Sequence, residues 1–353
     1  MSSPTPPTMQ QIADAAGVSR MAVSLALRNS PKISVTTAER IRKIADEMGY
    51  RPNPMVSALM TQLRHSRDSK KTSVLAYVTA FPTEGGWRRN PAHLAFHEGA
   101  RLRAEALGYM LEEWWLRRPG TTERRFCEIL RTRDIHGVIV APLPPGVDSL
   151  EIEWSWFAVA AIANSLACPD LNRASNDQFR SIATALRELS GLGYRRIGLA
   201  FVEGREDRMH EHWTAAMLSY QQSLPLAERV PTFHGAGPIG RSFTAWFQEH
   251  QPHAVISLGG ECLRVFRDLG LRVPQDVGYA NLGLTASERD MAGVNQHADL
   301  VGAAVVDLVD AQLRNNERGV PLVPRTVLLP GEWVAGPTVR DLRPQPRRQK
   351  VRA

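Results

Sequence analysis

The side chains best suited to chemistry in this chain belong to a short segment that begins at Ser19. Arg20 can donate two hydrogen bonds to O6 and N7 of guanine, while Met21 and Leu25 can contact the methyl group of thymine. The hydroxyls of Ser19 and Ser24 are suited to phosphate oxygens. A guanidinium, two apolar side chains and two hydroxyls this close together predict contact with DNA rather than catalysis.

Three short amphipathic helices are predicted to position this segment. Thr8 and Gln11 have the spacing of a capping box, and Gly17 is expected to end the first helix. Ser19 and Ser34 can cap the second and third helices. The apolar stripes predicted to form a common core are Ile12, Ala15 and Ala16; Ala22, Val23, Ala26 and Leu27; and Ile41, Ile44, Ala45 and Met48.

Two helices joined by a tight turn and backed by a third are typical of a helix-turn-helix, whose second helix enters the major groove of DNA. In that arrangement we expect Thr36 and Arg40 to contact phosphates. The other residues predicted to contact DNA in this head are Thr8, Asn29, Tyr50 and Asn53. The alternative is a three-helix unit that only packs or dimerises.

Basic residues are concentrated at the two ends of the chain. The formal net charge is +7, and residues 1–72 hold eleven Lys or Arg against five Asp or Glu. Residues 340–353 hold six basic residues and one acidic residue, so the body between them is mildly acidic. A basic head on an acidic body favours a polyanionic partner for the head. Charge alone would also fit an ordinary solvated surface.

Residues 8–53 resemble the DNA-binding head of the lactose-repressor/purine-repressor family. The shared marks are Ala13, Ala16, Gly17-Val18-Ser19, Val23-Ser24 and Gly49-Tyr50-x-Pro52-Asn53. The resemblance implies a sequence-specific transcription regulator, expected to be a repressor. It also implies a homodimer that binds a pseudo-palindromic operator in double-stranded DNA.

A hinge helix and linker are expected after the head, in residues 54–72. In the family, the two hinges of a dimer insert a pair of leucines into the minor groove, and the matching residue in this chain is Leu59. An apolar wedge between base steps kinks the duplex. The alternative is that Val56, Leu59 and Leu63 form one face of a core helix.

From Ser73 onward, apolar runs alternate with amphipathic stretches, which is typical of parallel sheets with crossover helices. The predicted strands are 74–79, 109–115, 137–141, 157–162, 196–201, a short one near Thr232, 254–258, 277–281 and 326–329. The predicted helices are 92–107, 122–133, 176–192, 209–223, 240–249, 260–269 and 299–315. Two successive α/β sets predict two lobes, with a ligand between the carboxyl ends of their strands.

The family resemblance extends to these lobes at residues 193–198 and 269–277, and Asn176-Asp177 matches a polar pair between the lobes of the family. The predicted fold is an all-α helix-turn-helix head plus an α/β two-lobed periplasmic-binding-protein-like sensor domain with two parallel-sheet subdomains. The predicted divisions are a disordered N-terminus 1–7, the head 8–53, the hinge 54–72, the sensor and dimerisation domain 73–339, and a basic disordered tail 340–353.

The resemblance implies a small-molecule effector between the lobes, with a sugar or sugar derivative as the candidate class. Three polar positions of the family fall here on Met209, Gly259-Gly260 and Gly283, so the usual grip on sugar hydroxyls is lost, and only Gln296 remains as expected. The residues predicted to contact an effector are Thr79, Phe81, Trp87, Pro142, Arg205, Arg208 and Gln296. The two aromatic residues of this set could stack on a sugar or base.

Other classes of function find less support in the residues. Cys127, Cys168 and Cys262 lack metal-ligand spacing, so we expect reduced, mostly buried thiols in a cytoplasmic protein. His93 and His97 are four residues apart but lack the Glu of an H-E-x-x-H metal motif. Neither a metal, a cofactor nor an enzymatic activity is predicted. A small-molecule binding protein without specific DNA activity is the remaining alternative, although no signal peptide or membrane span is predicted.

Overall fold

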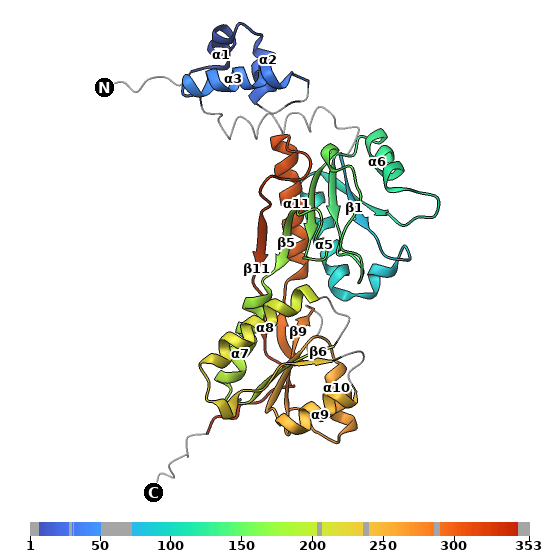
Figure 1. Ribbon diagram of the computed structural model, residues 1–353, viewed down its shortest axis with the longest axis vertical. Helices are drawn as coiled ribbons and strands as arrows, with labels where there is room; N and C mark the ends of the chain where they lie inside the picture. The colour runs from blue at the N-terminus through green and yellow to red at the C-terminus, as the bar shows by residue number, and fades with distance from the viewer. Residues whose placement is uncertain are drawn as a thin grey trace, which may run out of the picture.

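The computed structural model describes residues 7–27, 30, 32–50, 73–202, 207–235, 240–285 and 290–344. Within these residues it shows a small helical head followed by two α/β lobes (Figure 1). The predicted fold class is therefore confirmed: the first helices build the head, and each lobe has its own sheet. The predicted hinge, 54–72, lies outside the described residues.

The head consists of helices α1 (Met9–Ala16), α2 (Arg20–Leu27) and α3 (Val35–Glu47). Its predicted caps are confirmed, because Thr8 and Gln11 form a reciprocal capping box and Ser19 Oγ accepts from the backbone N–H of Ala22. The side chain of Ser34 likewise caps α3. Buried residues that form the core are Ile12, Ala13, Ala16, Val23, Ala26, Ala38, Ile41 and Ala45.

One position of the predicted head core is wrong. Ala15 is exposed, and Ala13 takes the core position instead. Helical periodicity alone does not decide between them, because Ala13 and Ala15 lie at equal angles on the two sides of the stripe through Ile12 and Ala16. The packing of α1 against α2 and α3 buries the side that carries Ala13.

The first lobe contains a six-stranded sheet in the order β11-β5-β4-β3-β1-β2, and all of its neighbouring strands are parallel. The strands are β1 (Ser73–Thr79), β2 (Tyr109–Trp115), β3 (Gly137–Val140), β4 (Ala158–Ile162), β5 (Asn172–Asn176) and β11 (Thr326–Leu329). The middle strands are buried along their length, as expected for a parallel sheet covered on both faces.

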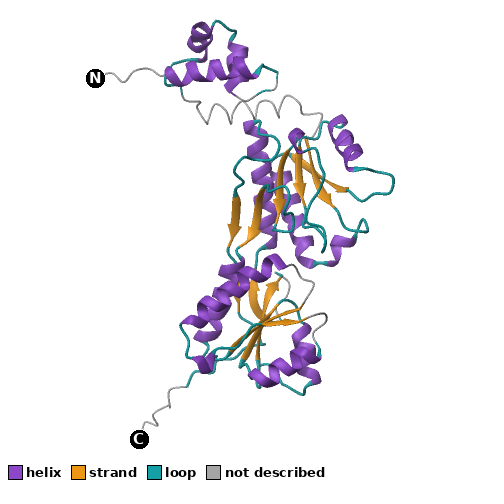
Figure 2. Ribbon diagram, in the orientation of Figure 1, coloured by secondary structure: helices purple, strands orange, loops and turns teal. Residues whose placement is uncertain are grey.

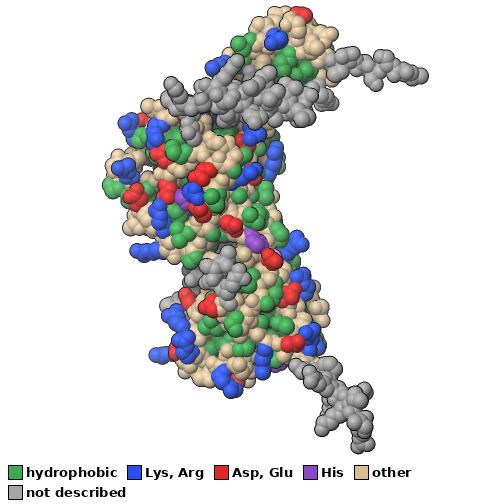
Figure 3. All heavy atoms as spheres, turned by 180° about the vertical axis from the view of Figure 1, so that it is seen from behind, with side chains coloured by type: hydrophobic (Ala, Val, Ile, Leu, Met, Phe, Trp, Pro, Cys, Tyr) green, Lys and Arg blue, Asp and Glu red, His purple; other side chains and the backbone are tan. Residues whose placement is uncertain are grey.

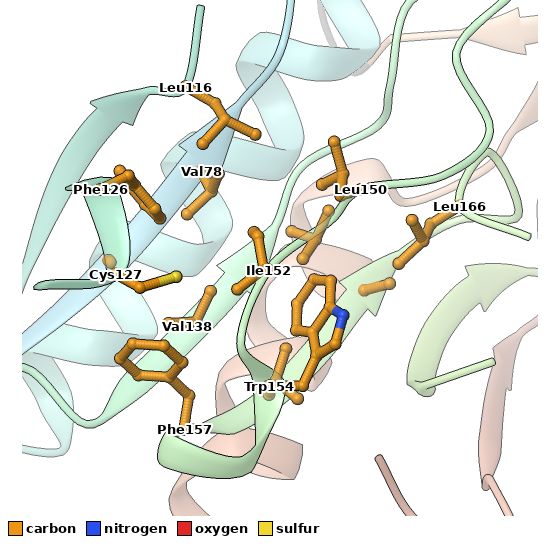
Figure 4. Packing of buried hydrophobic residues seen from close by; sticks show 14 of the residues in the cluster. Val78, Leu116, Phe126, Cys127, Val138, Leu150, Ile152, Trp154, Phe157 and Leu166 are labelled. Carbon is orange, nitrogen blue, oxygen red and sulfur yellow. The ribbon is translucent and has the colours of Figure 1, made fainter. Parts of the chain in front are cut away.

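Helices α5 (Pro91–Ala106) and α11 (Ala298–Asn315) cover one face of this sheet. The other face packs against α6 (Glu123–Thr132) and the segment around the short helix η2 (Trp154–Trp156), as Figure 4 shows for the cluster that includes Phe126 and Trp154. A further short helix, η1 (Gly86–Arg89), lies between β1 and α5. Both faces of the first sheet are thus closed by apolar side chains.

Helices α5 and α11 approach each other closely because two glycines lie at their crossing. A Cβ placed on Gly302 would lie 1.9 Å from the carbonyl oxygen of Phe96, and one placed on Gly99 would lie 1.8 Å from that of Asp299. These distances are far below van der Waals contact, so the two backbones can pack at this spacing only with glycine at both positions.

The second lobe repeats the plan with the strand order β12-β10-β9-β8-β6-β7. Its strands are β6 (Ile197–Val202), β7 (Phe233–Gly235), β8 (Ala254–Ser257), β9 (Gly278–Leu284), β10 (Ala292–Asn295) and β12 (Glu332–Val334), of which β12 runs antiparallel to β10. Its helices are α7 (Gln178–Gly191), α8 (Asp207–Gln222), η3 (Leu226–Glu228), α9 (Arg241–His250) and α10 (Glu261–Asp268).

The chain passes between the lobes at three places: from β5 into α7, from β10 into α11, and from β11 into β12. Each passage leaves the carboxyl end of a parallel strand, so the carboxyl ends of the strands in both sheets lie on the side where the lobes meet (Figure 2). This is the side on which open α/β sheets bind ligands.

Most predicted elements of the body are present within a few residues, but three strands escaped prediction: β5, β10 and β12. The predicted helix 176–192 begins at Gln178, because Asn176 ends β5 and Asp177 caps α7. Cys127 and Cys262 are buried and Cys168 is exposed, in line with the expectation of mostly buried thiols. Two residues assigned to the tail, Arg340 and Leu342, donate hydrogen bonds from their backbone N–H groups to Tyr194 Oη and the carbonyl oxygen of Leu192 in the second lobe.

Candidate DNA-binding head and ligand-binding lobes

Helix α2 presents the predicted reading residues at the surface of the head. Arg20 is exposed, Met21 is 69% exposed, and Leu25 is half-buried one turn further along. Ser19 accepts the N–H of Ala22 at 3.1 Å, so its oxygen is used in the cap while its hydroxyl proton can still be donated to a phosphate. The positive end of the helix dipole adds attraction for a phosphate at this end.

The opposite face of α2 is fixed to the rest of the head. Val23 and Ala26 are fully buried, and Arg42 Nε from α3 donates to the carbonyl oxygen of Ala26 at 3.1 Å. This bond satisfies one of the carbonyls that a helix leaves unpaired at its C-terminus. The exposed side chains of α2 therefore stand on an anchored helix, as base recognition requires.

The other predicted DNA contacts are distributed around α2. Thr36 and Arg40 are exposed on α3, and Thr8 is exposed at the start of α1, where its side chain is used as the cap. Tyr50 is half-buried against the head core, with its backbone N–H bonded to Ala45. The predicted contacts Asn29, Asn53 and Leu59 lie outside the described residues.

The predicted effector contacts in the first lobe lie at the carboxyl ends of strands but are mostly covered. Thr79 and Trp87 are each 2% exposed, and Pro142 is buried. Phe81 is half-buried, and its carbonyl oxygen accepts a hydrogen bond from Trp115 Nε1 at 2.8 Å. Arg205 and the side chain of Arg208 lie outside the described residues. Among the predicted effector contacts of the first lobe that the structure describes, the ring of Phe81 is therefore the one that is partly exposed.

Gln296 takes part in a hydrogen-bond network at the passages between the lobes. Its backbone carbonyl accepts from Asn176 Nδ2 at 2.5 Å, and its side-chain nitrogen donates to the carbonyl oxygen of Leu282. Its side-chain oxygen accepts from Gln178 Nε2 at 3.3 Å, and Gln178 Oε1 in turn accepts from Trp213 Nε1 at 2.7 Å. The amide of Gln296 is therefore already bonded within the protein.

Asn281 and Tyr279 fix the strand ends where the family's polar pair and Asp are replaced by glycines. Asn281 Oδ1 accepts from the backbone N–H of Gly259 at 2.9 Å and of Gly283 at 3.0 Å. The hydroxyl of Tyr279 donates to the carbonyl oxygen of Gly259. Asn281 is 1% exposed, so its amide organises the backbone from within. A polar residue inside an otherwise apolar strand was the sequence signal for this role.

The second lobe carries two surface grooves among the described residues. One of about 470 Å³ is lined by residues of α7 and the β12 region, among them Arg180, Arg187 and Trp333. The other, of about 370 Å³, lies between α9 and α10. The predicted effector contacts line neither groove.

The surface charge of the lobes is mixed. On the face drawn in Figure 3, both basic and acidic side chains are scattered over the two lobes. Short ion pairs, such as that of Arg133 with Glu112, occur in the structure. No described helix is long and apolar enough to cross a membrane. Among the same residues, no group of three His, Cys, Asp or Glu is placed to hold a metal ion.

Two protein families match this chain in succession. The pattern of the bacterial regulatory proteins of the lacI family matches residues 8–53, which is the helical head. The pattern of the periplasmic binding protein-like domain matches residues 186–339, which include most of the second lobe and the return to the first.

Curated relatives align with nearly the whole chain. The HTH-type transcriptional regulator PtxS of Pseudomonas plecoglossicida is 27% identical over 328 residues, covering 88% of this chain and 90% of the relative. The HTH-type transcriptional regulator CelR of Thermobifida fusca is 25% identical over 347 residues, covering 92% and 97%. The HTH-type transcriptional repressor CytR of Escherichia coli K12 is 25% identical over 300 residues, covering 80% and 82%.

Solved structures show the same fold. The complex of the transcriptional regulator CelR with cellobiose has a TM-score of 0.55 at 19% identity, and covers 94% of this chain and 99% of its own. The lac repressor dimer bound to operator and the anti-inducer ONPF has a TM-score of 0.54 at 18% identity, and covers 95% and 100%. Head and lobes therefore follow one another here as they do in these structures.

Proposed function

We propose that this chain, which belongs to the lacI family of bacterial regulatory proteins, is a transcription regulator that binds operator DNA through its head and responds to a small molecule between its lobes. The observation that carries the proposal is the exposed first turn of α2 on a head whose caps and core are complete. Arg20 and Met21 occupy this turn and read base edges in the major groove.

Two copies of the chain bind the operator together. A dimer with twofold symmetry presents its two heads to the two halves of a pseudo-palindromic site, and half-site spacing then follows from the dimer geometry. The lac repressor, which has the same fold, was solved as a dimer on its operator. The relative CytR is named a repressor, and this supports repression as the mode of action of this chain.

The effector is a small molecule held at the carboxyl ends of the strands, where the three passages join the lobes. A ligand that contacts both lobes favours one angle between them over another, and this shifts the population of heads able to bind DNA. The cellobiose complex of CelR supports a sugar or a sugar derivative as the class of ligand. Here the residues Thr79, Phe81, Trp87, Pro142, Arg205, Arg208 and Gln296 remain the predicted contacts.

A cytoplasmic, non-enzymatic protein fits this proposal. Its operator is in the cytoplasm of a bacterium, and the relatives are named as regulators rather than enzymes. A small-molecule binding protein without DNA activity is the alternative that the head argues against, because such a protein needs no exposed reading helix.

The test is selection of bound duplexes from a random DNA library with the full chain, at two salt concentrations. We expect enrichment of a palindrome, with a binding constant that falls as salt rises because phosphate contacts release counterions. A matched selection with Arg20→Ala should lose preference at one or two positions of each half-site. Uniform binding of all sequences, or none, would contradict the proposal.

A further inference from the structure

The chain leaves the second lobe at a fixed point on its surface. The backbone N–H of Arg340 donates to Tyr194 Oη at 3.0 Å. Two residues later, the backbone N–H of Leu342 donates to the carbonyl oxygen of Leu192 at 2.8 Å. Gly193 lies between these two acceptors, and a Cβ placed on it would meet the departing backbone at 3.2 Å. The residues that follow are therefore tethered to this one place, the exit point.

The exit point lies at the end of the second lobe that is farthest from the head (Figure 1). Helix α7 runs from the passages between the lobes, where Gln178 bonds Gln296, to the exit point beside Leu192. Helix α11 runs from the same passages along the first lobe to Asn315, on the side of the head. At 1.5 Å per residue, the two helices are about 21 Å and 27 Å long.

A dense run of positive charge follows the exit point. Arg343 itself is neutralised by Asp341, because its guanidinium lies 2.5 Å from the carboxylate. Four cations then occur within six residues, with no acidic residue among them: Arg347, Arg348, Lys350 and Arg352. This basic run, residues 347–352, lies outside the described residues, so its sequence and its point of attachment carry the argument. Short runs rich in Lys and Arg are typical of segments that bind a polyanion.

The composition of the basic run favours double-stranded DNA among polyanions. Segments that bind a bilayer surface combine positive charge with large apolar side chains, whereas residues 344–353 have only proline, valine and alanine as apolar residues. Single-stranded nucleic acid is bound largely by stacking of its bases on aromatic side chains, and the run has no aromatic residue. The phosphates of a duplex attract cations without either feature.

The DNA held by the head is out of reach of the basic run. Arg352 follows Arg343 by nine residues, so even a fully extended chain separates the two by at most about 32 Å. Helices α7 and α11 follow one another along the molecule and total about 48 Å, and the head lies beyond α11 (Figure 1). The basic run can therefore contact only a different DNA segment from the one that its own head reads.

We propose that the basic run of residues 347–352 is a second DNA-binding site, which holds the phosphate backbone of another DNA segment without reading its sequence. The regulator thereby bridges two DNA segments, one at the head and one at the far end of the second lobe. The inference rests on the proposed function only in that the head holds the first segment. Tethering to a protein that is already on DNA raises the local concentration of duplex, so a contact that is weak by itself becomes effective.

The decisive variant is the tail-neutral chain R347Q/R348Q/K350Q/R352Q, measured at full length. An operator duplex on beads is saturated with protein, and a labelled duplex of unrelated sequence is then added. The parent should capture this second duplex, and the tail-neutral variant should capture about tenfold less or weaker still, because four phosphate contacts are lost. Equal retention of both proteins on the beads shows that the head is intact.

The matched control removes four charges elsewhere on the lobes. The variant R89Q/R117Q/R118Q/R264Q changes four exposed arginines and has the same net charge as the tail-neutral variant. It should capture the second duplex as the parent does. A loss caused only by lower net charge would reduce capture equally in both variants, and this would overturn the assignment to the basic run.

The salt dependence of capture gives a second readout. Between about 50 and 200 mM salt, the slope of log K against log salt should be steeper in the parent by about 3–4 than in the tail-neutral variant, since each phosphate contact contributes about 0.9. Vesicles with phosphatidylglycerol compete in a parallel titration. The proposal is overturned if the parent captures no second duplex, if the tail-neutral variant captures as much as the parent, or if the four cations bind the vesicles more tightly than duplex. A parent that selects an operator but captures no second duplex refutes only this inference and leaves the proposed function standing.

Discussion

The indole nitrogen of Trp213 donates a hydrogen bond to Oε1 of Gln178 at 2.7 Å, which joins α8 to the first residue of α7. Nε2 of the same amide donates to Oε1 of Gln296, two residues before α11 begins. Gln178 therefore connects two of the three passages between the lobes to the interior of the second lobe. These hydrogen bonds hold the two passages in one geometry, and a ligand that changes the angle between the lobes acts on passages that are connected in this way.

Replacing Gln178 by leucine should destabilise the protein. The variant keeps the side-chain volume but leaves the Trp213 nitrogen, in a side chain that is 1% exposed, without its acceptor. The loss should be about 1–3 kcal/mol in the free energy of unfolding, measured by urea denaturation. Gln222→Leu, at an exposed position of α8, is the control and should change stability little. Equal stabilities of the two variants would contradict the role given to Gln178.

The glycine at the crossing of α5 and α11 gives a second prediction. Gly302→Ala should lower the free energy of unfolding by about 1–3 kcal/mol, although alanine favours helix by about 1 kcal/mol, because the added methyl meets the backbone of Phe96. Gly191→Ala has open space around its added methyl and should be neutral or slightly stabilising. If thermal unfolding places both variants at the temperature of the parent, the helices are less tightly packed than described.

The buried ring of His93 predicts a loss of stability at acidic pH. Burial holds its pKa at about 4 in the folded protein, against 6.5 for a free histidine, so the unfolded chain binds the proton more readily. The free energy of unfolding should therefore fall as pH drops from 6.5 through 4, by up to about 3 kcal/mol from this residue. His93→Gln should show a shallower fall than the parent in urea denaturation. A parallel pH dependence in parent and variant would rule out this contribution, and the half-exposed His136, replaced by Gln, serves as the control.

The fold was predictable where burial follows apolar residues. Strands such as β3 and β4 are continuous apolar runs, and their helices have clear stripes. Strand β5 escaped prediction because its residues are mostly polar, yet all are buried. Arg173 can be buried there because it donates to the carbonyl oxygens of Ala163 and Leu166 and pairs with Asp170. Only the folded chain supplies these partners, so no local pattern reveals them.

The two candidate sites differ in the same way. The reading face of α2 could be predicted because caps and helical periodicity place Arg20 and Met21 at the surface. The sensor residues lie in connections without periodicity, where side-chain direction is set by distant contacts. Trp87 is predicted to contact a ligand, and its burial against Tyr77 has no signal in the local sequence. Gln178 and Trp213 are too far apart in sequence for their pairing to be inferred.

Arg20 is expected to carry part of the sequence preference of the head. Arg20→Ala should reduce discrimination at one or two base positions by about 1–3 kcal/mol each, the value of a bidentate contact to guanine. Lys43→Ala removes an equal charge from an exposed position on α3, where Lys43 pairs with Glu47. That control should weaken binding to all sequences slightly and leave the preferred sequence unchanged. Identical preferences in parent and Arg20→Ala would exclude base reading by this residue.

Leu59 provides a test of the hinge, which lies outside the described residues and rests on the sequence resemblance. If a pair of these leucines wedges between base steps of the minor groove, Leu59→Ala should weaken binding to the selected operator much more than to random duplex, because only the specific complex includes the kinked step. The unfolding temperature of the lobes should not change. Electrophoretic titrations of both duplexes provide the comparison, with Leu63→Ala as the control. Equal operator affinities for Leu59→Ala and the parent would leave the head alone responsible for specificity.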